Sequence, residues 1–261
     1  MFQPVRLLLL VFAVTLASSA LAQDKDREKA KKVFKLPRNK KATVVSLDFQ
    51  GGFTPPRLKN TPTMSILADG TVQIPANYQG QTERNGEVSA DDLQALLRFL
   101  VEECKLLEFD EKSIKAKIAK QGGPRAIIAD AATTVIRVTV NGKTKEARWY
   151  PSPGADLKEL RQFQAARMRL MQVRSVVELG GKKEALQWLD LANKELKAKH
   201  PKVKPLMFEH LQSGGVRANG SVYVSITRVE GDDPKKRIVT SVFINKLADK
   251  PPKVTVTYRA P

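Results

Sequence analysis

Runs of β-branched residues, most with apolar and polar side chains in alternation, predict β-strands in eight stretches of the chain. The predicted strands are residues 43–49, 63–67, 71–74, 133–140, 143–150, 221–229, 237–245 and 253–258. Asp69-Gly70 and Asn141-Gly142 each lie between two consecutive strands and favour tight hairpins. The last three strands have short connections, which predicts an antiparallel meander. The polar residues 75–88 are expected to form a surface loop.

Apolar residues spaced three and four apart predict helices in four stretches, of which the second is the least regular. The predicted helices are residues 89–107, 110–120, 156–179 and 182–197. Ser89 and Asp156 are suited to cap two of them, and Gly180-Gly181 separates the last two. The chain lacks the regular alternation of strands and helices that is typical of parallel sheets. The predicted fold class is therefore α+β, an antiparallel sheet with hairpins packed against three or four helices and followed by a C-terminal β-meander.

The single cysteine, Cys104, continues the apolar face of the first predicted helix. That face consists of Leu93, Leu97, Leu100, Cys104 and Leu107. One cysteine cannot form an intramolecular disulfide, so the core must depend on ordinary packing. We expect Cys104 to be buried and structural rather than a catalytic nucleophile.

The first 22 residues have the parts of a secretory signal peptide. Arg6 supplies the positive charge, residues 7–17 are apolar apart from Thr15, and Ala20-Leu21-Ala22 has the small residues read by signal peptidase. The alternative, a membrane anchor, is disfavoured because a spanning helix needs about 20 apolar residues. We therefore expect cleavage of residues 1–22, a secreted or periplasmic protein, and no transmembrane segment in the mature chain.

The chain is strongly basic, and this balance indicates which partners it attracts. Cleavage of the leader removes only Arg6 among the charged residues, which leaves 44 basic and 27 acidic residues. Such a charge steers anionic partners toward the protein. Because export makes nucleic acid an improbable partner, we expect an anionic envelope polymer, an anionic lipid surface or an acidic protein. The alternative is that the excess charge forms an ordinary solvated surface.

Residues 23–41 contain nine basic and three acidic residues and few apolar ones, which predicts a basic flexible arm. The candidate residues for binding an anionic partner lie in this arm: Lys31, Lys32, Lys35, Arg38, Lys40 and Lys41. A solvated spacer is the alternative interpretation. We expect an α+β domain over residues 42–200. The C-terminal strands, residues 201–261, would form a separate subdomain or join the same sheet.

Motifs for catalysis, metals and cofactors are scarce, and we predict neither a catalytic residue nor a cofactor. His200 and His210 do not have the spacing of metal ligands. His210 follows Glu209, and these two residues are the candidates for a hydrolase of unrecognised type. No Gly-x-Ser-x-Gly turn and no phosphate-binding glycine motif supports an enzyme.

The order of elements over residues 43–150 is strand, Asp-Gly hairpin, helix, strand, Asn-Gly hairpin, strand. The residues that carry this order are Asp69-Gly70, residues 89–93, Asp130, Thr133-Thr134 and Asn141-Gly142-Lys143. The order resembles an uncharacterised family of small exported bacterial α+β domains of unknown function. The resemblance implies an exported module without assigned chemistry, and it transfers no functional residue to this chain.

Three hypotheses for function follow from the sequence. The first is a non-enzymatic binding or interaction module for an anionic envelope component or a protein partner. The second is a hydrolase with a site near Glu209 and His210. The third is a module that only bridges other proteins. An enzyme needs a concave pocket with convergent polar groups, including a titratable one, and the presence of such a pocket would distinguish the hydrolase from the other two.

Export is tested by N-terminal sequencing of the protein from its host. We expect the mature chain to begin at Gln23, because signal peptidase cleaves after the small residue of the Ala20-Leu21-Ala22 site. A soluble cytoplasmic form that retains Met1 would contradict the prediction.

Overall fold

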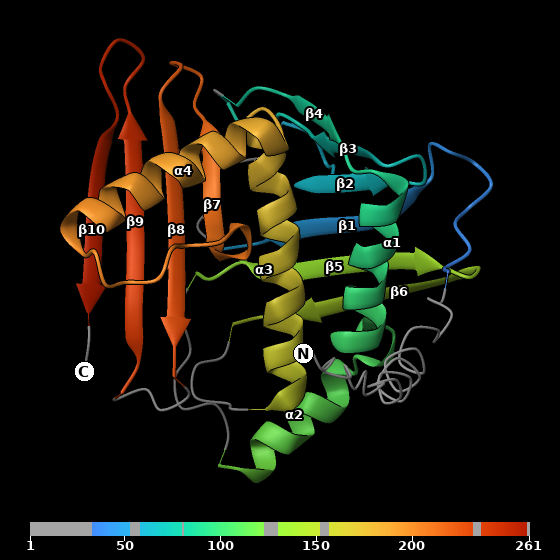
Figure 1. Ribbon diagram of the computed structural model, residues 1–261. Coiled ribbons are helices and arrows are strands. Elements are labelled where there is room, and N and C mark those ends of the chain that lie inside the picture. The colour runs from blue at the N-terminus through green and yellow to red at the C-terminus, as the bar shows by residue number, and fades with distance from the viewer. Residues whose placement is uncertain are drawn as a thin grey trace, which may run out of the picture. The chain divides into compact units, whose positions relative to one another are not determined.

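The strands of the first half of the chain build one antiparallel sheet around β1 (Thr43–Gln50) and β5 (Thr133–Val140). The computed structural model describes residues 33–52, 58–79, 81–122, 130–151, 157–231 and 236–259. Within these residues the strand order is β4-β3-β2-β1-β5-β6, which we name sheet A (Figure 1). Its other strands are β2 (Met64–Leu67), β3 (Thr71–Ile74), β4 (Arg84–Glu87) and β6 (Lys143–Trp149).

Alternation along these strands separates a buried face from a polar one. Val45 and Leu47 of β1 pair with Val138 and Ile136 of β5, and all four side chains are buried. Between them, Ser46 pairs with the exposed Arg137 on the opposite face. The β5–β6 turn has positive φ at both Asn141 and Gly142, as the Asn-Gly sequence predicts.

The first predicted helix, residues 89–107, is shorter and less regular than expected. Ser89 caps α1 (Ala90–Arg98) by accepting a hydrogen bond from the N–H of Asp92. A π-helical turn, Phe99–Glu103, follows, and Lys105 in the left-handed conformation ends the helix before the short 3₁₀ turn Leu106–Glu108. The wider turn and the break change which side chain faces inward, so that Leu106 rather than Leu107 is fully buried.

Cys104 is buried, as predicted, with 4% of its surface exposed. Burial in the core, assisted by the nearby Glu103 carboxylate, raises the pKa of the thiol to about 11. The thiol is therefore protonated at neutral pH.

Further along the chain, α2 (Glu111–Lys120) begins at its predicted position, with Asp110 as its cap.

The second half of the chain forms two helices and a second antiparallel sheet. The helices are α3 (Lys158–Glu178) and α4 (Lys182–Lys199), and Gly180 and Gly181 both have positive φ between them. Asp156, the predicted cap of α3, lies outside the described residues. Sheet B has the order β10-β9-β8-β7 in the described residues. Its strands are β7 (Leu211–Val216), β8 (Val222–Glu230), β9 (Ile238–Lys246) and β10 (Lys253–Arg259).

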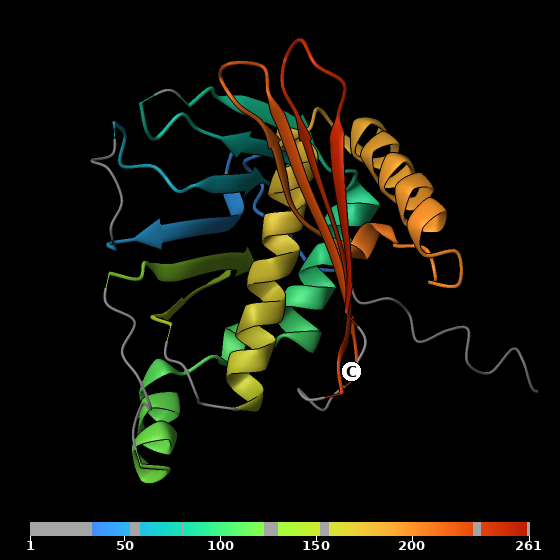
Figure 2. The same ribbon diagram turned by 90° about the vertical axis from the view of Figure 1, so that its left-hand side faces the viewer.

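Helix α4 belongs to the C-terminal sheet rather than to the domain in which we expected it. Its predicted apolar face, Ala185, Leu189, Ala192 and Leu196, is buried in one cluster with side chains of β8 and β9. Figure 2 shows sheet B from its edge, with α4 along one face. Helix α3 contributes most of its buried residues to the cluster under sheet A. A domain boundary at residue 200 would therefore separate α4 from the side chains with which it packs. By their contacts, residues Phe34–Pro261 form one compact unit.

Two short strands occur where no strand was predicted. Residues 75–88 were expected to form a loop, but Arg84–Glu87 is strand β4 and pairs with β3. Leu211–Val216 is strand β7 and pairs with β8. Both strands contain glycine and lack an alternating apolar pattern, and both are edge strands. The predicted α+β class with a C-terminal meander is confirmed, and four α-helices are present in the described residues.

The fold begins before the expected end of the basic arm, which corrects our assignment of residues 23–41. Phe34 is 2% exposed in the core of sheet A. Its N–H and C=O bond to the side chain of Gln94 on α1, at 2.9 and 3.0 Å. Lys35 makes two further hydrogen bonds with Asn141. The ring of Phe34 anchors the segment, because burying it is strongly favourable, and Leu36 packs against the same core.

No helix in the described part of the chain is long and apolar enough to cross a membrane. The predicted signal peptide, residues 1–22, lies outside the described residues, as do residues 23–32.

Replacement of Phe34 by alanine tests the anchoring of this segment. We expect Phe34→Ala to lower the free energy of unfolding by about 3–5 kcal/mol, the usual cost of removing a buried aromatic side chain. Val33→Ala is the matched control, because the neighbouring Val33 is 71% exposed. Chemical denaturation of both variants gives the comparison, and equal stabilities would show that the segment contributes nothing to the core.

Candidate anion-binding groove

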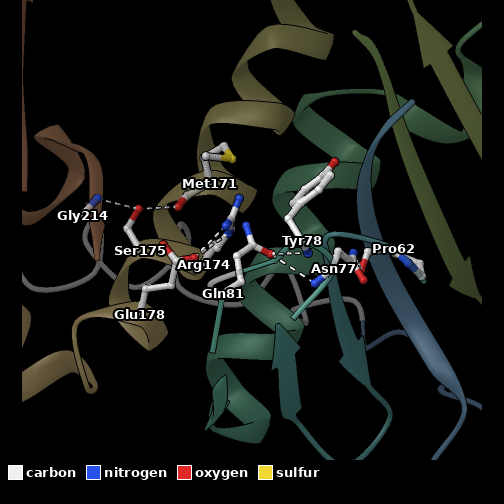
Figure 3. Close-up of polar contacts among 9 residues, drawn as sticks. All are labelled: Pro62, Asn77, Tyr78, Gln81, Met171, Arg174, Ser175, Glu178 and Gly214. Carbon is white, nitrogen blue, oxygen red and sulfur yellow. Dashed lines mark hydrogen bonds and ion pairs between the residues drawn. The ribbon is translucent and has the colours of Figure 1, made fainter. Parts of the chain in front are cut away.

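The C-terminal half of α3 lies against edge strands of both sheets. A Cβ atom on Gly86 of β4 would lie 2.7 Å from Cγ2 of Val177. One on Gly214 of β7 would lie 2.7 Å from Cδ1 of Leu179, the residue that ends α3. The buried Ser175 also accepts a hydrogen bond from the N–H of Gly214, at 3.1 Å (Figure 3). Glycine at these two positions allows a helix approach that a side chain would block.

Next to this contact lies a groove of about 460 Å³ between the two edge strands. Its residues come from the end of β3 and the start of β4, from α3, and from the β7–β8 hairpin. They are Ile74, Pro75, Gln81, Thr82, Arg84, Arg174, Glu178, Gly215, Val216, Arg217, Ala218, Asn219 and Tyr223. A volume of this size is within the range of small-molecule sites, about 300–1,000 Å³.

Three arginines and one glutamate line the groove. Arg174 donates two hydrogen bonds to Oε1 of Glu178, at 3.0 Å from Nε and 2.7 Å from Nη2. Among the described residues, neither Arg84 nor Arg217 has an acidic side chain within ion-pair distance. The groove therefore has a surplus of positive charge that its own carboxylate does not neutralise.

Two side-chain amides in the lining have a fixed orientation. Oε1 of Gln81 accepts hydrogen bonds from the N–H groups of Asn77 and Tyr78, at 3.1 and 3.2 Å (Figure 3). Oδ1 of Asn219 accepts from the N–H and the hydroxyl of Ser221, at 3.1 and 2.7 Å. Because these partners are donors, each amide must use its oxygen here and keep its NH₂ group for another acceptor. In Figure 3 the nitrogen of Gln81 lies on the side of Arg174.

Tyr223 forms part of the groove wall. Arg217 lies over its ring, with 5.5 Å between the guanidinium carbon and the ring centroid. Burial, with a smaller effect of the Glu178 carboxylate, raises the pKa of the Tyr223 phenol above its usual value. The phenol is therefore protonated at neutral pH and can donate a hydrogen bond. Guanidinium, amide and phenol groups together give the groove an excess of donors.

The binding residues expected from the sequence lie elsewhere. Lys31 and Lys32 are outside the described residues, and Lys35, Arg38, Lys40 and Lys41 are exposed on the segment that precedes β1. Lys40 lies beside the β2–β3 turn, where its C=O accepts a hydrogen bond from the N–H of Asp69. The groove is at the opposite end of β3, at Ile74. None of the four described candidates lines it.

The residues of the hydrolase hypothesis also lie outside the groove. Glu209 and His210 belong to the 3₁₀ turn Phe208–His210, where Nδ1 of His210 accepts a hydrogen bond from the N–H of Met207, at 2.7 Å. Burial lowers the pKa of His210. The hydrogen bond from Met207 gives the imidazole a structural role at the start of the turn. Within the described residues, no group of three histidine, cysteine, aspartate or glutamate side chains could hold a metal ion.

The groove residues could not be grouped from the sequence because they are scattered along the chain. Arg84 was placed in a loop, and Arg217 follows a strand that was not predicted. The available signals were the Gly214-Gly215 pair and the isolated Gly86, which indicate places of close backbone approach.

No protein-family model matches this chain, and no curated protein and no solved structure was found to be similar to it. The resemblance to an exported bacterial family stays a prediction.

The close approach of α3 to β4 can be tested at Gly86. We expect Gly86→Ala to lower the free energy of unfolding by about 1–3 kcal/mol, because the added methyl group overlaps the stiff side chain of Val177. In the double variant with Val177→Ala the methyl has space, so the two effects should not add. Asn85→Ala, at an exposed neighbour, is the control. Additive losses in this cycle would show that the two residues do not interact.

Proposed function

We propose that the protein is an exported, non-enzymatic binding module for an anionic partner, and that the groove between β4 and β7 is its binding site. The observation that carries the proposal is the pair of arginines, Arg84 and Arg217, that line a concave surface without an ion-pair partner in the described residues. Guanidinium groups bind carboxylates, sulfates and phosphates through paired hydrogen bonds. Export rests on the predicted signal peptide.

The groove supports this function better than the exposed basic residues before β1 do. Lys40 and Lys41 are exposed, their side chains make no hydrogen bond or ion pair within the described residues, and each loses rotamer entropy when it binds. Three of the groove donors are held by existing contacts, namely Arg174 by Glu178 and the two oriented amides by their partners, and Arg217 lies over the ring of Tyr223. Preorganised donors bind an anion at a lower entropic cost.

Binding of two anionic probes by the mature chain tests the proposal. The probes are poly-glutamate and dextran sulfate, measured by titration calorimetry in a salt series. We expect Arg84→Ala/Arg217→Ala to raise the Kd at least about tenfold, because a hydrogen bond to a charged group contributes about 1.5–3 kcal/mol. The Kd should also rise with salt for the unchanged protein.

The matched control is Arg38→Ala/Lys41→Ala, which removes the same charge from the exposed segment before β1. We expect its Kd to stay within about twofold of that of the unchanged protein. A loss confined to this control would move the site to the basic segment. Equal small losses in both variants would indicate attraction by net charge alone and would contradict a binding groove.

A further inference from the structure

The hydrogen-bonding groups of the groove define its ligand more closely than its charge does. The NH₂ groups of Gln81 and Asn219 and the guanidinium groups of Arg84 and Arg217 all donate. A ligand must therefore offer several acceptors. An anionic group satisfies the arginines, and uncharged oxygens satisfy the amides.

One group in the lining has the opposite requirement. Glu178 uses Oε1 for Arg174, while Oε2 makes no hydrogen bond with a described residue and lies against the backbone of Gly215. The Glu178 side chain is 17% exposed, so its remaining oxygen faces a partly dry environment. A ligand that displaces water from this oxygen must supply a donor, and a polyanion that offers only acceptors binds less tightly for that reason.

A hydroxylated ring that carries a carboxylate meets both requirements. Its carboxylate can bind Arg84 and Arg217, for which the described residues supply no ion-pair partner, and each hydroxyl can accept from an amide and donate to Glu178 at the same time. The apolar parts of Ile74, Pro75 and Val216 and the ring of Tyr223 supply surface for the CH groups of such a ring. We propose that the groove binds acidic sugar units of the uronic-acid type. This inference rests on the proposed function.

An acidic peptide is the competing ligand, and the structure disfavours it. A peptide would gain most by adding a strand to the open edge of β7. The N–H of Gly214 on that edge already donates to Ser175 of α3, and Ser175 in turn donates to the C=O of Met171, at 2.9 Å (Figure 3). The helix therefore occupies the position that an added strand would need.

Calorimetry with matched ligands tests the inference on the mature chain. The ligands are tri-galacturonate, its methyl ester, and a glutamate peptide with the same charge as tri-galacturonate. We expect tri-galacturonate to bind at least about tenfold more tightly than either of the others. The ester keeps the hydroxyls without the charge, and the peptide keeps the charge without the hydroxyls.

Glu178→Gln then tests the role of the acceptor. The substitution removes the negative charge and keeps the shape of the side chain. We expect the preference for tri-galacturonate over the glutamate peptide to fall at least about fivefold, partly through stronger binding of the peptide. Circular dichroism of this variant verifies that α3 remains folded.

The outcomes separate this inference from the proposed function. Equal affinity for tri-galacturonate and the glutamate peptide, with both lost in Arg84→Ala/Arg217→Ala, overturns the sugar assignment and leaves an anion-binding groove. Tighter binding of the peptide indicates an acidic protein partner instead. Equal binding of the ester excludes the carboxylate as the recognised group. Failure of all three ligands to bind overturns the inference, and the poly-glutamate and dextran sulfate titrations decide separately whether the proposed function also fails.

Discussion

The close contact of helix α3 with glycines on two edge strands is the interaction on which the rest of the structure depends. Val177 of α3 occupies the space that a side chain at Gly86 of β4 would need. Leu179, at the end of α3, occupies the space that a side chain at Gly214 of β7 would need. Val177 belongs to the core of sheet A and Leu179 to the core of sheet B. Within two residues, one helix therefore passes from one hydrophobic core to the other. In Figure 1, α3 runs between the two sheets.

The groove is a direct result of this arrangement. Edge strands leave backbone groups without a neighbouring strand, and a protein must cover or protect them. Here α3 covers part of both edges, and Ser175 satisfies one of the open N–H groups of β7. Beyond the helix, the space between β4 and β7 is lined by polar side chains of both sheets. Three arginines therefore gather at the place where the two sheets meet the end of α3.

Periodicity predicted the elements that bury a whole face and missed those that do not. The alternating residues 133–140 and the helical face of α4 were predicted correctly, because their side chains alone determine which face is buried. Strands β4 and β7 have no such pattern, since glycine packing against α3 decides their place. Phe34 was missed for a related reason: Val33, Phe34 and Leu36 are too few to establish a period in a charged segment. The groove could not be predicted, because it brings together three segments that are distant in sequence.

The order of strands has a consequence for the path by which the chain folds. In sheet B every strand pairs with its neighbour in sequence, so the sheet can form from local contacts. In sheet A, β1 pairs with β2 and with β5, and the chain passes through β3, β4, α1 and α2 before β5 is reached. The edge of β1 that pairs with β5 thus stays open until the chain has reached Thr133. Contacts of high sequence separation form slowly, and we expect closure of β5 on β1 to limit the folding rate, leaving the unfolded chain open to self-association until that step is complete.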